Sequence, residues 1–336
     1  MNILLLQLKR IGDLVLTTPA IEALHKEFPD ARINIVVTRT SAGLLPAVQY
    51  IDQSFVVGRV LDNLRIFRAI WRQEFDYCID FTRNDRSAFL TFLSRAKKRI
   101  GSSRIRARST FRGRAYTDFV QERGHNLHAA DYILSLLEPL GIRNASGALH
   151  LEIPAAAREA GDALLQRAGV DKPFIIFHPG AAREERYWGP ERWAAIIEHA
   201  QTKWQMAAVL TGVTSRSEKA HLSQIKNKVR QPLVDLSGRT DLLTLTALIS
   251  RAQLIVTLDS ATMHLAAATR TPQVALFGPG NPFHWGPRHT PALVLYGEST
   301  TPVTEFSPDQ PRLPMHLIST QTVINAMDSL LSAPAA

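Results

Sequence analysis

The chain has 336 residues, of which 45% are hydrophobic and 21% charged, and 39 Lys and Arg face 30 Asp and Glu. This composition is typical of a soluble globular protein, and it excludes disorder, collagen and a coiled coil as the main character. The length predicts two domains. A net charge of +9 leaves nucleic acid, an anionic membrane surface and an anionic substrate open as partners.

The sequence predicts a cytoplasmic protein. Cys78 is the single cysteine, so no internal disulfide and no cysteine-based zinc site can form. The apolar N-terminal residues precede Lys9 and Arg10, whereas a secretion signal has its basic residues first. No uncharged apolar run approaches the roughly 18 residues of a membrane span.

Short apolar runs alternate with amphipathic ones along the whole chain, which predicts parallel βαβ units. In the N-terminal half, strands are predicted at 3–8, 32–38 and 75–81, and helices at 13–28, 63–71, 86–95 and 126–141. In the C-terminal half, strands are predicted at 174–180, 207–212, 254–259 and 273–280, the last of them taken as the final strand. Helices are predicted there at 190–203, 215–228, 241–250, 261–268 and 320–331.

The predicted fold class is α/β, with two doubly wound Rossmann-like domains facing across a cleft. We expect an N-terminal domain at 1–155, a C-terminal domain at 172–315, and a last helix within 316–333 that packs back on the N-terminal domain. Ligands of such sheets bind beyond the carboxyl ends of the strands, so the loops that follow strands are the candidate sites.

The first such loop carries Gly12 and Asp13. An N-cap is the commoner use of an Asp at the start of a helix. The alternative is a general base that takes a proton from a substrate hydroxyl.

The second loop, at 178–193, carries Arg183 and Arg186 before Tyr187 and Trp188. It is either a surface loop whose Trp packs on its own helix or a phosphate clamp, since Arg presents a fork of donors to phosphate oxygens. The residues alone leave these two interpretations equal.

The third and fourth loops follow the predicted strands at 254–259 and 273–280. Ser260, Ala261 and Thr262 would offer free N–H groups at a helix N-terminus, which is an anion site. For His264 a packed or capped histidine is favoured over a metal ligand, because no second ligand stands at suitable spacing. The Gly- and Pro-rich stretch 277–289 is a structural turn or a diphosphate contact. Neither half contains a dinucleotide-binding G-x-G-x-x-G, a P-loop or a G-x-S-x-G elbow.

Several stretches resemble the motifs of glycosyltransferase family 9, in order and over nearly the whole chain. They are I-G-D-L-V-L-T-T-P-A-I, H-P-G-A…R-Y-W-G, L-S-G-R-T-D-L…L-I-S-R-A and D-S-A-T-M-H-L-A-A-A…L-F-G-P-G. This family comprises the heptosyltransferases that build the lipopolysaccharide inner core from ADP-heptose. The C-terminal tail, and more weakly the FTRNDR stretch at 81–86, is more similar to type III members than to types I and II.

The resemblance implies a GT-B fold and an inverting transfer with ADP-heptose as donor substrate, no metal and no other cofactor. It places the acceptor on the N-terminal domain and the nucleotide sugar on the C-terminal one. Asp13 matches the proposed base. The implied donor-binding residues are Gly12, Arg186, Gly212, Glu218, Thr240, Asp259, Ser260, Ala261, Met263 and His264.

Two departures from the family pattern concern the donor. Arg186 stands where Lys is usual, which keeps the charge and changes the geometry. Gly180, Ala181 and Ala182 replace hydroxyl residues often found early in the phosphate loop, so backbone N–H groups remain there as donors.

The segment 86–117 contains ten basic residues and no acidic one. A solvated loop is one interpretation. The other is a patch for an anionic acceptor, the Kdo and phosphate groups of a lipid A–Kdo core, with Arg83, Arg104, Arg106 and Arg108 as its candidate residues. The same patch would hold the protein peripherally on the cytoplasmic face of the inner membrane of a Gram-negative bacterium.

Three rival functions stay open: a GT-B nucleotide-sugar 2-epimerase, a non-catalytic nucleotide-sugar-binding protein and a nucleic-acid-binding protein. A family 9 transferase with another nucleotide sugar is a fourth alternative. The absence of a nucleic-acid module and the few aromatic residues within the basic segment argue against nucleic acid.

Overall fold

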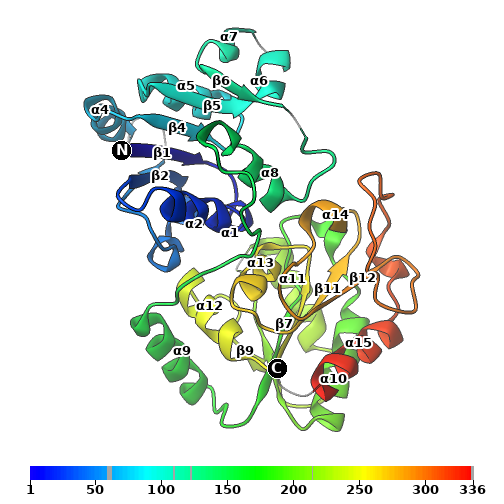
Figure 1. Cartoon of the computed structure of the whole chain (residues 1–336). Helices are drawn as coiled ribbons and strands as arrows, with labels where there is room; N and C mark the ends of the chain where they lie inside the picture. Colours follow the sequence, from blue (N-terminus) through cyan, green and yellow to red (C-terminus); the bar gives the residue numbers. More distant parts are fainter. Residues whose placement is uncertain (59–62, 109, 122, 214, 334–336) are drawn as a thin grey trace. The chain divides into compact units, whose positions relative to one another are not determined.

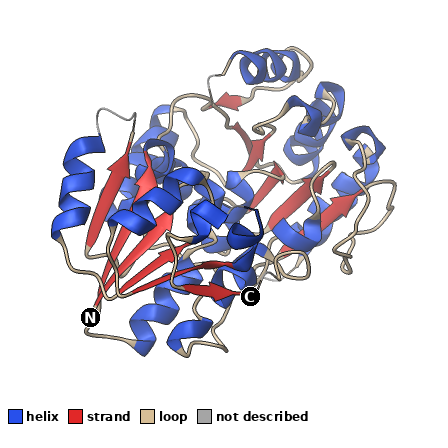
Figure 2. Cartoon of the chain, turned by 90° about the horizontal axis from the view of Figure 1, so that it is seen from above, coloured by secondary structure: helices blue, strands red, loops and turns tan. Residues whose placement is uncertain are grey.

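The structure is a computed structural model, and it describes residues 1–58, 63–108, 110–121, 123–213 and 215–333. The side chains of residues 106–108, 110 and 111 lie outside this description. By their contacts the residues form two units, Met1–Glu152 and Ile153–Ala336. Each unit contains one parallel six-stranded sheet with helices on both faces (Figures 1 and 2).

The first sheet has the strand order β3-β2-β1-β4-β5-β6. The chain adds β2 and β3 on one side of β1 and then crosses over to form β4, β5 and β6 on the other side. Its strands are β1 (Asn2–Gln7), β2 (Arg32–Thr38), β3 (Gln53–Val57), β4 (Tyr77–Asp80), β5 (Lys98–Ser102) and β6 (Asp118–Val120). The α-helices are α1 (Ile11–Val15), α2 (Thr18–Glu27), α3 (Arg39–Ala42), α4 (Leu64–Arg72), α5 (Asp85–Leu93), α6 (Ser103–Arg108), α7 (Thr110–Gly113) and α8 (Ala129–Ser135). Among the described residues of this unit, 3₁₀ turns are η1 (Leu45–Ala47) and η3 (Glu138–Leu140).

The second sheet repeats this plan with the order β12-β11-β10-β7-β8-β9. Its strands are β7 (Phe174–His178), β8 (Ala207–Leu210), β9 (Val234–Asp235), β10 (Leu254–Leu258), β11 (Gln273–Phe277) and β12 (Ala292–Tyr296). The α-helices are α9 (Ala155–Arg167), α10 (Pro190–Lys203), α11 (Arg216–Lys226), α12 (Leu242–Arg251), α13 (Ala261–Ala268), α14 (Pro282–Trp285) and α15 (Thr320–Ser332). Short 3₁₀ turns are η4 (Glu184–Arg186) and η5 (Met315–Leu317).

Both sheets have their first strand at the centre, where continuous apolar runs are buried on both faces. In β1, residues Ile3–Leu6 are fully buried, and the strand pairs with β2 on one side and β4 on the other. In the second unit, β7 occupies the same position between β8 and β10. The predicted α/β class with two doubly wound sheets is confirmed. Each sheet has its topological switch point beside the central strand, where α/β sheets bind ligands.

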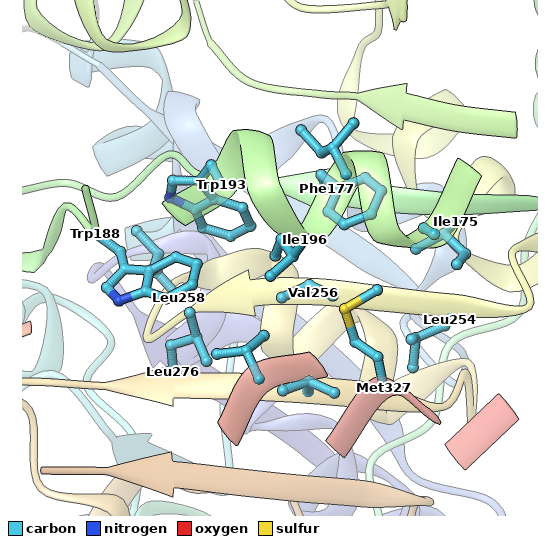
Figure 3. Close-up of a cluster of buried hydrophobic side chains, with 14 of the residues drawn as sticks. Ile175, Phe177, Trp188, Trp193, Ile196, Leu254, Val256, Leu258, Leu276 and Met327 are labelled. Atoms are coloured by element: carbon cyan, nitrogen blue, oxygen red, sulfur yellow. The ribbon is translucent and has the colours of Figure 1, made fainter. Parts of the chain in front are cut away.

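The core of the second unit contains two perpendicular indole rings. Trp188 and Trp193 are fully buried, with ring centroids 5.5 Å apart (Figure 3). The Trp188 indole N–H also donates to the backbone carbonyl of Ile318 at 3.0 Å. Buried indole groups of this kind fix a chain segment because they fill volume and satisfy a polar atom together.

The structure corrects several predicted elements. The helix expected at 13–28 is two helices, α1 and α2, because Pro19 lacks an N–H and starts a new helix. The strand at 273–280 is followed by another strand, β12. Helix α9 lies between the two predicted domains, where the sequence predicts no helix. The basic segment, for which a solvated loop was one interpretation, contains β5, α6 and α7.

The last helix packs in the second unit. Helix α15 contacts α10 and strands β10, β11 and β12, and Val323 and Met327 are buried in their core. These contacts of α15 lie within the second unit, Ile153–Ala336. Its apolar face is matched by the sheet of its own unit.

Candidate functional site

Asp13 lies in the first turn of α1, directly beyond the carboxyl end of β1. Its carboxylate accepts the backbone N–H of Arg10 at 3.3 Å, and Lys9 Nζ lies 3.7 Å from its other oxygen. The Asp13 side chain keeps 15% of its surface exposed. The N-cap position itself belongs to Arg10, so Asp13 is a partly accessible carboxylate with a neighbouring cation. Gly12 is buried in the same turn.

Lys9 is a largely buried cation with charges of both signs around it. Its pKa is lowered mainly by desolvation, with a further lowering by Arg83, while Asp13 and Asp80 oppose the shift. These interactions show that the loops after β1 and β4, which are neighbouring strands, bring their charges to one edge of the sheet. The Asp13 carboxylate thus lies beside Lys9, and Arg83 from the loop after β4 lies near enough to Lys9 to act on its charge.

Asp80, the last residue of β4, accepts several hydrogen bonds from the residues around it. Its fully buried carboxylate accepts the N–H groups of Thr82 at 2.7 Å and Arg83 at 3.2 Å, and the hydroxyls of Ser87 at 2.7 Å and Tyr116 at 2.6 Å. Desolvation raises the pKa of Asp80, and these four hydrogen bonds oppose that shift. Arg83 has a φ of 67°, a left-handed conformation that is unusual for a residue with a side chain. Asp80 therefore fixes the backbone from which the Arg83 side chain extends.

A pocket of about 340 Å³ opens in the first unit at this point. It is lined by Thr82, Arg83, Arg104, Ile105 and Arg112. The described residues of its lining include three arginines and no carboxylate, so the pocket suits an anion. The Arg83 guanidinium also stacks over the Tyr132 ring at 4.6 Å.

Two of the four arginines predicted for the acceptor, Arg83 and Arg104, line this pocket. The side chains of Arg106 and Arg108 lie outside the described residues. Arg112 was missed as an individual residue, although it belongs to the basic segment. It forms an ion pair with Asp85, the first residue of α5. No sequence signal separates Arg112 from its basic neighbours, because the fold of α6 and α7 decides which of them reach the pocket.

In the second unit, Arg186 is placed by the loop between β7 and α10. The buried Trp188, two residues further on, anchors this loop in the core (Figure 3). The side chain of Arg186 then donates from Nη1 to the backbone carbonyl of Asp259 at 2.7 Å and pairs with its carboxylate at 3.0 Å. Its Nε is buried and has no hydrogen-bond partner among the described residues. The guanidinium thus retains a donor that is not used.

Asp259 follows β10 and precedes α13. Its side chain is buried, and a Cβ at Gly280, in the loop after β11, would collide with its carboxylate. Ser260 is the N-cap of α13 in an extended conformation, and its hydroxyl bonds Thr262 at 3.0 Å rather than capping a backbone N–H. The first amides of α13 therefore lack a side-chain cap and can receive an anion.

The other residues predicted on α13 are buried. Ala261 is its first residue, and Met263 is fully buried against Ala275 and Phe277. His264 is 5% exposed, which agrees with a packed histidine. A role for Met263 in donor binding is confined to its backbone. Among the described residues, no group of three or more His, Cys, Asp and Glu is placed to hold a metal ion.

Glu218 is enclosed by two glycines. Its carboxylate occupies the space that a Cβ at Gly180 or Gly212 would need, and it accepts the backbone N–H of Val213 at 2.8 Å. Desolvation raises its pKa. The loop that contains Thr240 lies beside the loop after β8, because Gly238 donates its N–H to the Gly212 carbonyl at 2.9 Å. The loops after β7 and β8 thus enclose the Glu218 carboxylate between two glycines.

The model of glycosyltransferase family 9 (heptosyltransferase) matches residues 63–311. A curated relative, lipopolysaccharide heptosyltransferase 3 of Escherichia coli, is 26% identical over 95% of this chain and 96% of its own. A family 9 glycosyltransferase structure from Veillonella parvula superposes with a TM-score of 0.84 at 25% identity, covering 98% of this chain and 97% of that one.

A further structure supports the fold alone. The E. coli protein described as ADP-heptose lps heptosyltransferase II has a TM-score of 0.80 at 20% identity, with 98% of each chain covered. In the part of this chain that is described, no helix has the length and apolar character needed to span a membrane.

Proposed function

Because the chain belongs to glycosyltransferase family 9, the heptosyltransferases, we propose that it transfers heptose from ADP-heptose to a hydroxyl of the lipopolysaccharide inner core. The transfer inverts the anomeric carbon and needs no metal ion. The observation that carries the donor half of this proposal is Arg186 fixed beside the start of α13. The relatives' names, which include ADP-heptose and lipopolysaccharide, agree with it.

The second unit binds the donor. Arg186 and the first amides of α13 receive the diphosphate, since a guanidinium and a helix N-terminus both favour phosphate oxygens. Gly212, Glu218 and Thr240 lie along the neighbouring loops for the nucleoside part. The carbonyl of Asp259 and the carboxylate of Glu218 are acceptors for hydroxyl groups.

The first unit binds the acceptor and supplies the base. Asp13 takes the proton of the acceptor hydroxyl as its oxygen attacks the anomeric carbon. The bond between that carbon and the β-phosphate oxygen breaks, and ADP leaves with its electron pair. Arg186 and the α13 amides stabilise the charge that builds on the β-phosphate, which is the task of a divalent ion in other transferases.

The pocket of Arg83, Arg104 and Arg112 receives the anionic groups of the acceptor, the carboxylates and phosphates of a lipid A–Kdo core. Such an acceptor is anchored in a bilayer, so the enzyme works at the cytoplasmic face of the inner membrane as a peripheral protein. Nucleic acid is not among its proposed partners.

A transfer assay tests this function. Purified protein, ADP-heptose and a lipid A–Kdo acceptor should release ADP and give a heptosylated product of opposite anomeric configuration, at the same rate in EDTA as in magnesium. Loss of turnover in EDTA overturns the metal-free transfer. Conversion of the nucleotide sugar without any acceptor would identify a 2-epimerase instead.

A further inference from the structure

Helices α4 and α5 expose an unusual number of large apolar side chains. Of the seven that are exposed in the described part of the chain, four lie on these two helices. The exposed fractions are 66% for Leu64, 47% for Trp71, 48% for Phe89 and 63% for Phe92. Apolar patches with a polar rim mark interaction surfaces on soluble proteins.

The two helices present these side chains together. Ile66 and Phe67 of α4 and Leu93 of α5 pack on the same apolar cluster of the first sheet, so both helices cover one face of it (Figure 1). The Phe67 and Phe89 rings meet edge to face at 5.3 Å across the seam. Arg95, after α5, places its guanidinium 4.6 Å from the Trp71 ring. The exposed rings of Phe89 and Trp71 are therefore each held by a neighbouring side chain.

Arginines border this apolar seam. On α4, Leu64, Arg68, Trp71 and Arg72 follow the spacing i, i+4, i+7 and i+8, which places them on one face of the helix. Arg65 is exposed on the border of the same face. Helix α4 has no acidic residue, and Asp85 of α5 is paired with Arg112. The surface thus joins exposed aromatic and aliphatic groups to a cluster of arginines.

We propose that this α4–α5 surface, made of Leu64, Arg65, Arg68, Trp71, Arg72, Phe89, Phe92 and Arg95, docks the protein on an anionic phospholipid bilayer. Trp, Phe and Leu enter the boundary between headgroups and acyl chains, while arginines beside them bind the lipid phosphates. A protein partner would need acidic groups in matching positions, whereas a bilayer supplies anions at every position. The inference rests on the proposed function, because only a lipid-anchored acceptor requires the enzyme to reach a membrane.

Vesicle co-sedimentation of the full chain, without any nucleotide sugar, tests the surface. The wild type should bind vesicles rich in phosphatidylglycerol and not vesicles of phosphatidylcholine. The variants Trp71→Ser/Phe92→Ser and Arg65→Gln/Arg68→Gln/Arg72→Gln should each lose at least about tenfold in vesicle affinity, since each basic residue near an anionic surface contributes roughly a fivefold change.

Two matched variants serve as controls. Tyr50→Ser removes an exposed aromatic ring of the same unit, and Arg143→Gln/Arg167→Gln/Arg230→Gln removes three exposed charges from elsewhere. Both should bind vesicles within twofold of the wild type. Unchanged circular dichroism shows that the docking variants fold, and their transfer to a deacylated, water-soluble acceptor should stay within twofold of wild type.

Three results would overturn the docking surface. They are vesicle binding by both docking variants at wild-type affinity, no binding of wild type to anionic vesicles, and a wild-type dimer in ultracentrifugation that Trp71→Ser/Phe92→Ser makes monomeric. The last result would identify a second copy of the chain as the occupant. Vesicle binding without heptose transfer refutes the proposed function alone, and transfer without vesicle binding refutes the docking surface alone.

Discussion

Arg186 holds Asp259 at two points, with one hydrogen bond of 2.7 Å to its backbone carbonyl and an ion pair of 3.0 Å to its carboxylate. The pair joins the loop after β7 to the loop after β10, which are neighbouring strands of the second sheet. The carboxylate fixes the guanidinium beside the start of α13 before any ligand arrives. A diphosphate bound there would meet a cation that is already oriented.

The first prediction concerns this cation. Arg186→Ala should weaken ADP binding by roughly 100-fold, because charge-assisted hydrogen bonds are lost and the uncompensated Asp259 carboxylate repels the diphosphate. Arg186→Lys should lose about tenfold or less, since the charge remains. Isothermal titration with ADP measures both. Arg183→Ala is the control, as Arg183 pairs with Glu185 in the same loop, and an equal loss there would contradict a specific role for Arg186.

The second prediction concerns the enclosure of Glu218. Gly180→Ala should displace the Glu218 carboxylate, destabilise the second unit by about 1–3 kcal/mol and weaken ADP binding, because the added Cβ occupies its place. Thermal unfolding with and without ADP measures this. Gly161→Ala on α9, whose Cβ would make ordinary contacts at 3.5 Å, should leave ADP binding unchanged. Equal behaviour of the two variants would mean that the enclosure has no effect on the donor.

The third prediction separates acceptor from donor. Asp80→Asn replaces two acceptor oxygens by one, so the turn of Thr82 and Arg83 loosens and the arginine pocket loses its shape. The KM for the acceptor should rise about tenfold, while the affinity for ADP stays within twofold. Tyr116→Phe removes only the bond of 2.6 Å and should give a smaller rise. A change in ADP affinity of similar size would show general unfolding instead.

The fourth prediction addresses the base. Asp13→Asn keeps the size of the side chain and removes its ability to take a proton, so kcat should fall by about 10²–10⁴-fold with little change in ADP affinity. Lys9→Met should change kcat less, because the carboxylate survives. A kcat for Asp13→Asn within tenfold of wild type would exclude Asp13 as the base.

The fifth prediction is a pH dependence of stability. Burial lowers the pKa of His178 to about 4, and its ring bonds Thr211 at 2.9 Å. Above pH 6.5 the His178 ring is mainly neutral in both the folded and the unfolded protein. Between pH 6.5 and 4 the ring binds a proton in the unfolded protein but stays neutral in the folded one. Stability from this group is therefore lost as pH falls from about 6.5 to 4, by roughly 3 kcal/mol in total.

Denaturant unfolding of wild type and His178→Asn at pH 7.5 and pH 4.5 measures this dependence. The wild type should lose more stability than the variant between the two values, and the difference cancels the contribution of all other titrating groups. Parallel pH profiles for the two proteins would refute the assignment.

The sequence predicts the alternation of strands and helices, because central strands such as β7 and helices such as α10 have long regular patterns. It does not predict β5 or β12, since β5 is basic and contains a glycine and β12 lies among glycines and prolines. Helix α9 has its buried residues at helical spacing, namely Ala157, Gly161, Leu164 and Leu165, so the sequence contains a pattern for this helix. The pattern is weak because two of these four positions, Ala157 and Gly161, hold small residues instead of large apolar ones.

The sequence likewise predicts some residues of the candidate site and not others. Residues within contiguous motifs, such as Asp13, Arg186 and Asp259, can be named from the sequence. Asp80 cannot, because its importance comes from Tyr116, which is 36 residues away in the chain and bonds it only in the folded unit. The fold of the basic segment likewise decides that Arg112 lines the pocket.

Calorimetric titration of the wild type with ADP, UDP, GDP and CDP in the absence of metal ions tests the proposed donor most directly. We expect selective binding of ADP, with an affinity that EDTA does not change. Preference for UDP, or ADP binding that requires a divalent ion, would contradict an ADP-heptose transferase that relies on Arg186 and the start of α13.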